Sequence, residues 1–469
     1  MRAVVLLWSL FFSVHCAKIG VFLGFLDNPS ENKFISDIAE DLDRSHDVVL
    51  IEYVAGTTAS SQKKKIISLG VVATEKLEDY REAVKREVDE DFRYVNYFAT
   101  KNAAREALQY VCEVALNSTD FMKSIVNENF EISIHLADDE CANGLAQYMG
   151  SKVIVVEDGS PSRESLEHVS VPTHLSLMPH PVLGVAQHSN ILQKTATFVL
   201  HIYSQLASIF ETSTLQKIQK RLGSHISSNI KAQLLFARAD ENYEIAVPTT
   251  PRVVYLQNFD STIIKSSEDL RSLLQKAETI VLVSLEDYNE KMTPVLAEIF
   301  RYNKDVSFVW IGKHHFDSID NLFFVPKSDI TKVLESSKSK VLLTNGKNEN
   351  ILHAIYSGTP MLIVPQTFSE MRNAALAKQR GIAEVMSKEN FTAAVFQKEL
   401  NHILHFEFLS KTINSLLSGF TSELHVNNTF QLYSLDVIFI LTIVALVLRK
   451  LLSWYYWSCF EMSYKQKLE

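Results

Sequence analysis

The stretch KVLLTNGKNENILHAIYSGTPMLIVP, residues 340–365, decides the fold class of this sequence. It opens with an apolar run at Lys340–Thr344 and closes with another at Met361–Val364. The segment between the two runs is long enough for a helix. A strand, a helix and a second strand in this order are typical of one unit of a parallel sheet.

The same alternation continues on both sides of this stretch. The preceding strands of this half are expected at Ile280–Leu285 and Ser307–Ile311, and a proline-containing connector at Ala246–Pro251 comes before them. We therefore predict an α/β protein with two domains, 17–245 and 246–425, and a ligand site in the cleft between them. The segments that give the N-terminal half the same pattern are 18–24, 31–45, 47–54, 130–136, 140–149 and 153–156.

Composition narrows the function classes. The 469 residues are 46% hydrophobic and 22% charged, which is typical of a folded globular chain. With 46 basic and 55 acidic residues the net charge is −9, so we expect no nucleic-acid partner, because phosphate binding needs clustered cations. The 14 glycines, about 3% against a usual ~7%, leave few positions for close approach of the backbone to a phosphate.

The two ends of the chain predict a membrane protein. Residues 1–16 have the basic start and short apolar core of a secretory signal peptide, although a buried first strand is an alternative. Residues 432–448 are mostly apolar and are followed by Arg449-Lys450; as a helix they would reach about 25 Å, slightly short of a ~30 Å hydrocarbon core. The basic residues place the tail, 449–469, in the cytosol.

Three further features predict the compartment. Lys465 and Lys467 form a KxKxx ending that resembles the retrieval signal of type I membrane proteins of the endoplasmic reticulum. Of the cysteines, Cys112 and Cys141 would lie in the lumen, so one disulfide is possible, and whether the two pair stays open. Glycosylation sequons begin at Asn117, Asn390 and Asn427.

The C-terminal half contains the segments Phe324-Val325-Pro326-Lys327, Thr344-Asn345-Gly346-Lys347, Ala354–Pro360, Pro365 and Arg372-Asn373-Ala374-Ala375. These segments resemble the signature region of the UDP-glycosyltransferases, glucuronosyltransferase branch. The resemblance implies a GT-B arrangement of two Rossmann-like domains plus a C-terminal transmembrane helix. It also implies a UDP-sugar co-substrate with no other cofactor and no metal, a lipophilic acceptor, and a homo- or hetero-oligomer with related transferases.

The catalytic positions implied by the resemblance have changed. The family uses a histidine as general base and an aspartate that orients it, and the matching positions here are Glu31 and Leu136. Glutamate has a reference pKa about two units below that of histidine, so it is a weaker base. Asp139 is a second candidate base. It belongs to the run Asp138-Asp139-Glu140, which resembles a manganese-binding cluster but is also placed to cap a helix, and we favour capping.

The donor-binding positions have changed as well. Phe324 replaces a tryptophan that stacks on uracil, Lys327 replaces a glutamine, and His353 replaces a glutamate that contacts ribose. Glu286-Asp287 replaces Gly-Ser, which would set two carboxylates against a dianionic diphosphate. The donor-binding positions that the resemblance implies are Ser284, Asp287, Phe324, Lys327, Asn345, Gly346, His353 and Glu370.

Two functions are therefore open. One is a glycosyltransferase of the endoplasmic reticulum membrane that passes a hexosyl or glucuronosyl group from a UDP-sugar to small lipophilic acceptors. The other is a catalytically deficient family member that acts as a membrane-bound binding or assembly partner.

Overall fold

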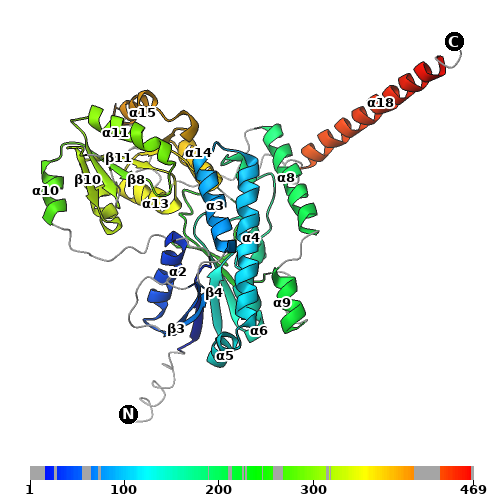
Figure 1. Cartoon of the computed structure of the whole chain (residues 1–469), viewed down its shortest axis with the longest axis horizontal. Coiled ribbons are helices and arrows are strands. Elements are labelled where there is room, and N and C mark those ends of the chain that lie inside the picture. The colour runs from blue at the N-terminus through cyan, green and yellow to red at the C-terminus, as the bar shows by residue number, and fades with distance from the viewer. Residues whose placement is uncertain are drawn as a thin grey trace, which may run out of the picture.

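A computed structural model gives the fold of this chain. The residues that it describes are 16–25, 29–54, 65–71, 75–187, 190–209, 214–223, 227, 230–245, 247–256, 268–312, 316, 318–405 and 434–465. Within them, two α/β domains each carry a parallel sheet, as the sequence predicts, and α18 projects away from both (Figure 1).

The first domain is built on a seven-stranded sheet of described residues in the order β3-β2-β1-β4-β5-β6-β7. Apolar side chains cover both faces of this sheet, which is why its strands read as nearly continuous apolar runs. The strands are β1 (Lys18–Phe22), β2 (Asp47–Val54), β3 (Lys65–Val71), β4 (Ile132–Leu136), β5 (Lys152–Glu157), β6 (Leu234–Ala237) and β7 (Val253–Tyr255). The helices are α2 (Pro29–Leu42), α3 (Glu75–Asp89), α4 (Tyr94–Asn117), α5 (Thr119–Glu128), α6 (Glu140–Met149), α7 (Arg163–His168), α8 (Ile191–Ile209) and α9 (Thr214–Leu222).

The second domain repeats this plan with a six-stranded sheet of described residues in the order β10-β9-β8-β11-β12-β13. Residues 340–365 form nearly all of β11 and the whole of α13 and β12. β11 pairs with β8 and β12 in parallel. The strands are β8 (Ile280–Ser284), β9 (Ser307–Ile311), β10 (Leu322–Val325), β11 (Ser339–Thr344), β12 (Met361–Ile363) and β13 (Ala383–Val385). The helices are α10 (Glu268–Lys276), α11 (Thr293–Tyr302), α12 (Ile330–Leu334), α13 (Asn348–Ser357), α14 (Phe368–Gln379) and α15 (Ala393–His405).

The boundary between the domains lies further along the chain than residue 245. β7 pairs with β6 through Leu235↔Val253, Phe236↔Val254 and Ala237↔Tyr255, so the first sheet extends to Tyr255. A strand this short carries too little periodicity to be recognised in the sequence.

The sequence left open whether Cys112 and Cys141 pair, and the structure shows a disulfide between them. Cys112 on α4 and Cys141 on the first turn of α6 are bonded, with their Cα atoms 5.6 Å apart. Both residues are buried in the core of the first domain. The bond therefore ties two helices that pack on the same face of the sheet.

A buried lysine joins the two domains. Lys388 donates from Nζ to the carbonyl oxygens of Glu87 at 2.5 Å, Val88 at 3.1 Å and Gln366 at 2.7 Å. It also lies over the ring of Phe92, 4.4 Å from the centroid. The last turn of α3 is thus held against the second domain.

The ends of the chain are described in part. α18 extends from Leu435 to Lys465. Oδ2 of Asp436, in its first turn, lies 3.9 Å from Nζ of Lys194 on α8. Across the described residues, no helix is long and apolar enough to cross a membrane. Residues 1–15 of the predicted signal peptide, the sequon at Asn427 and Lys467 lie outside the described residues.

Candidate functional site

The candidate site lies where the strand order of each sheet reverses. In the first sheet this point is between β1 and β4, and in the second it is between β8 and β11. Ligands of open parallel sheets bind outside the carboxyl ends of the strands at such points. The two edges face each other. Ser30 lies in the first turn of α2, and its Oγ is 3.4 Å from Oε2 of Glu349 on α13.

Lysines and acids of the second domain form a paired cluster at this edge. Lys327 Nζ lies 3.0 Å from Glu286 Oε1 and 3.0 Å from Glu349 Oε2. Lys347 Nζ lies 3.1 Å from Glu286 Oε2 and 3.0 Å from Asp287 Oδ2. Each ammonium group therefore already contacts two carboxylates.

The lysines and acids of this cluster stabilise one another's charged forms. Burial acts to raise the pKa of Glu286, but the charges of Lys347 and Lys327 outweigh it and hold that pKa below its usual value. Glu349 behaves in the same way: against its burial, a hydrogen bond from His353 and the charges of Lys327 and Arg238 hold its pKa well below the usual range. Both carboxyl groups are therefore ionised at neutral pH.

Arginine 238 extends the cluster into the first domain. Arg238, which follows β6, is 4% exposed and pairs with Asp158, to which its Nε donates at 2.5 Å. Its guanidinium also donates to Ser30 Oγ at 2.6 Å and lies over the Phe34 ring, 4.8 Å from the centroid. Asn348 of α13 donates to the carbonyl oxygen of Arg238, so the contact crosses between the domains.

Four of the expected donor-binding residues are buried and turned inward. Asn345 donates from Nδ2 to the carbonyl oxygen of Glu286 at 2.9 Å and to Glu370 Oε1 at 2.6 Å. Ser284 donates to Asn350 Oδ1 at 3.2 Å. His353 Nε2 lies 3.9 Å from Glu349 Oε1, and its side chain is 4% exposed. In these positions the side chains contact other protein groups.

Glu370, the fourth of these residues, has a local structural role. Its Oε2 accepts hydrogen bonds from the backbone N–H groups of Gln366 at 2.8 Å and Thr367 at 3.1 Å. With Thr367 as the N-cap, this is a capping box at the start of α14. Burial raises the pKa of Glu370 to about 7.

The other expected donor-binding residues line the edge itself. Phe324 is 45% exposed, and Asp287 is exposed with a φ of 50°. Gly346 has a φ of 95°, and a Cβ there would lie 2.9 Å from Ile363 Cγ2, so the turn from β11 into α13 requires glycine. Of the expected set, the structure thus brings Asp287, Phe324, Lys327 and Gly346 to the surface of the edge or to its turn.

On the first-domain side, Glu31 lies beside the contact of Ser30 with Glu349. It lies in the first turn of α2, next to Ser30, and is partly exposed. Burial raises the pKa of Tyr80, and the negative charges of Glu31 and Asp138 raise it further, so these three residues lie close together. Leu136, at the position of the orienting aspartate, is buried.

Asp139 caps α6, as we favoured. Its Oδ1 accepts from the backbone N–H of Ala142 at 2.9 Å, and the residue is 1% exposed. Burial raises its pKa to about 7. Asp139 is therefore enclosed at the start of α6, whereas Glu31 is partly exposed.

Sequence reasoning missed the residues at the contact between the two domains: Ser30 and Glu349 meet across it, and Arg238 and Asp158 pair beside Ser30. Ser30 and Glu349 are 319 positions apart, and Arg238 belongs to no motif. One signal was available, because Glu349 precedes His353 by one helical turn inside the signature region.

The comparisons with known proteins agree with this architecture. Among solved structures, the spinosyn forosaminyltransferase SpnP matches with a TM-score of 0.55 and 12% identity, over 87% of this chain and 95% of that one. LpCGTa, solved in complex with UDP, matches with a TM-score of 0.50 and 11% identity, over 90% and 98%. The fold is therefore that of the GT-B glycosyltransferases.

The sequence comparisons give the family. Residues 26–425 match the family described as UDP-glucoronosyl and UDP-glucosyl transferase, and the chain belongs to it. Human UDP-glucuronosyltransferase 3A2 is 24% identical over 386 residues, covering 76% of this chain and 71% of that protein. The putative UDP-glucuronosyltransferase ugt-48 of Caenorhabditis elegans is 23% identical over 298 residues, and the match covers 58% of this chain and 56% of that relative.

Proposed function

We propose that this chain is a catalytically deficient member of its family that acts as a binding or assembly partner in the endoplasmic reticulum membrane. The observation that supports this is the paired cluster of lysines and acids at the carboxyl edge of the second sheet. The ammonium groups of Lys327 and Lys347 are neutralised by the chain's own carboxylates, Glu286, Asp287 and Glu349. A diphosphate must displace those carboxylates to reach either lysine.

The charge balance works against a UDP-sugar. Among the cluster residues named above, the four carboxylates of Glu286, Asp287, Glu349 and Asp158 face three cations. A dianionic diphosphate entering this space meets net negative charge, and each unit repulsion at about 4 Å near a surface is worth several kcal/mol. Breaking a buried pair to admit it leaves an uncompensated charge, which costs more.

Calorimetry with UDP tests the proposal. We expect the detergent-solubilised full chain to bind UDP with a Kd weaker than ~1 mM, or less than about 4 kcal/mol of binding free energy. The double variant Glu286→Gln with Glu349→Gln releases both lysines, so its UDP affinity should rise at least tenfold. Glu335→Gln, which removes an exposed acid beyond the cluster, is the matched control and should change nothing. A low-micromolar Kd for the unmodified chain would contradict the proposal.

A second candidate is the transferase itself, passing a hexosyl or glucuronosyl group from a UDP-sugar to a lipophilic acceptor. Supporting it, Glu31, at the position that the resemblance assigns to the base, lies near Tyr80 and is partly exposed. In that case Glu31→Gln should lower transfer to phenols at least tenfold and spare amines, which need no base. Glu40→Gln, which removes an exposed acid on the same helix, is the control. Background turnover in every variant would exclude this candidate.

We further propose that residues 17–431 lie in the lumen of the endoplasmic reticulum, with residues 432–448 as a single span and a cytosolic dilysine tail. The buried disulfide Cys112–Cys141 supports an oxidising compartment. Asn117 and Asn390, the described sequon residues, are exposed, as glycan attachment requires. Protease added to sealed microsomes should remove only the tail, and digestion of the body would contradict this topology.

A further inference from the structure

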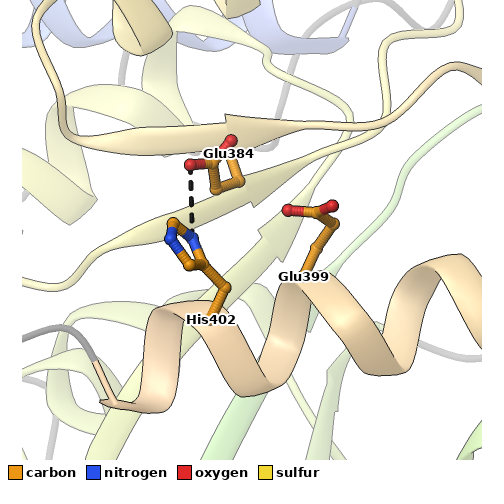
Figure 2. A group of neighbouring side chains, drawn as sticks. All are labelled: Glu384, Glu399 and His402. Carbon is orange, nitrogen blue, oxygen red and sulfur yellow. Dashed lines mark ion pairs between the residues drawn. The ribbon is translucent and has the colours of Figure 1, made fainter.

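A cluster of metal-ligating side chains lies away from the paired cluster described above, at the β13 edge of the second domain. Glu384 comes from β13, and Glu399 and His402 come from α15 (Figure 2). We propose that these three residues form a binding site for Zn²⁺. The cluster is separated from the switch point between β8 and β11 by strand β12, so it is independent of the function proposed above.

The geometry of the three residues fits a tetrahedral ion. One ligand atom from each residue lies within 4.8 Å of the other two, and His402 Nδ1 is 3.4 Å from Glu384 Oε1. Zinc bonds of about 2.0–2.1 Å at tetrahedral angles place neighbouring ligand atoms ~3.3 Å apart. The His402–Glu384 edge therefore already has the dimension of a zinc site, and Glu399 completes it by a side-chain rotation.

Rigid elements hold the three ligands. Glu399 and His402 are spaced i, i+3 on α15, so they share one face of the helix, as Figure 2 shows. Their neighbours Leu400 and Ile403 are buried in the core of the domain, which sets the orientation of α15 and therefore of the face that carries Glu399 and His402. Glu384 is held by the ladder of β13 with β12, where it pairs with Leu362.

The site is open to solvent and to incoming ions. A surface hollow of about 720 Å³ is lined by Lys398, Glu399, Asn401 and His402. Three protein ligands and an open position on the hollow side leave room for one water on the metal, which is the arrangement of accessible zinc sites.

Two lysines compete for the carboxylates. Lys378 Nζ lies 3.4 Å from Glu384 Oε2, and Lys398 Nζ lies 3.3 Å from Glu399 Oε1. Both lysine side chains are mostly exposed, and ion pairs of exposed lysines contribute little. A divalent ion with an imidazole ligand displaces them, and the imidazole favours Zn²⁺ over Mg²⁺ or Ca²⁺, which prefer oxygen ligands.

Bound zinc would tie the edge strand to the helix that packs beside it. The test is calorimetric titration of ZnCl₂ into the full chain after treatment with a chelator. We expect one site that MgCl₂ does not block, with affinity lowered at least tenfold in each of His402→Ala, Glu399→Gln and Glu384→Gln. Asn401→Ala, which changes the hollow but no ligand, should bind as the unmodified chain does. Lys398→Gln should bind equally or more tightly.

Two further readouts separate binding from folding. The metal-free variants should unfold at the same temperature as the metal-free parent, and Zn²⁺ should raise the unfolding temperature of the parent only. Co²⁺ in place of Zn²⁺ should give the visible absorption of a tetrahedral site, lost in His402→Ala. The proposal is overturned if the parent binds no Zn²⁺ or if His402→Ala binds it unchanged.

Discussion

The carboxyl edges of the two sheets both carry acidic residues, and the protein treats them in opposite ways. In the first domain, Asp139 and Glu157 are buried, accept hydrogen bonds from backbone N–H groups, and have pKa values raised by burial to about 7. In the second domain, Glu286 and Glu349 are paired with lysines, and their pKa values are lowered. An acidic residue after a parallel strand therefore indicates a site only when its partners are known.

The buried ion pair of Arg238 with Asp158, at the edge of the first sheet, should give the largest effect. Arg238→Ala removes the cation that faces Asp158 and Ser30 and leaves a buried carboxylate unpaired. Breaking a buried pair in this way costs about 3–5 kcal/mol. We expect a clear fall in the unfolding temperature, measured by scanning calorimetry. The double variant Arg238→Met with Asp158→Leu should recover most of the lost stability. A fall below ~1 kcal/mol in Arg238→Ala would show that the ion pair of Arg238 with Asp158 is not formed.

The loss of the Cys112–Cys141 disulfide should give the second-largest fall in stability. Cys112 and Cys141 close a loop with a sequence separation of 29, for which the chain-entropy estimate is about 3–4 kcal/mol. Replacing both by Ala should lower the unfolding temperature, and adding a reductant should then shift the parent but not the variant. If reductant lowers both equally, the bond does not stabilise the fold.

The pH dependence of unfolding should separate the two edges directly. Asp139 has its folded pKa raised to about 7, so its ionisation destabilises the folded state as the pH rises from about 4 to 7. Glu286 has its folded pKa lowered, so its contribution is present above about pH 4 and is lost as the pH falls below that value.

Each group changes the slope by at most about 1.4 kcal/mol per pH unit. Asp139→Asn should therefore flatten the decline between pH 4 and 7, and Glu286→Gln should flatten the loss on the acid side. The measurement is the unfolding temperature from pH 3 to 8. The same change of slope in both variants would contradict the contrast between the edges.

The sequence predicts the fold better than the site, and the residues show why. The strands at 340–344 and 361–364 are encoded locally, because an apolar run and a helical pattern extend over a few residues. The contact of Ser30 with Glu349 depends on how two domains meet, and no local pattern records it. Asn345 fits a donor-binding motif, yet its amide turns to Glu370, because a buried carboxylate on α14 needs that donor.

The cap at Asp139 gives the smallest expected effect and the sharpest test of the first edge. Asp139→Ala removes the acceptor for the Ala142 N–H and should cost about 0.5–2 kcal/mol, as loss of an N-cap does. Asp139→Asn keeps an oxygen acceptor but removes the buried charge, so at pH 7.5 it should match or exceed the stability of the parent. The unfolding temperatures of the two variants at that pH decide the point. If Asn destabilises as much as Ala, the negative charge of Asp139 is needed, and its role is not that of a cap alone.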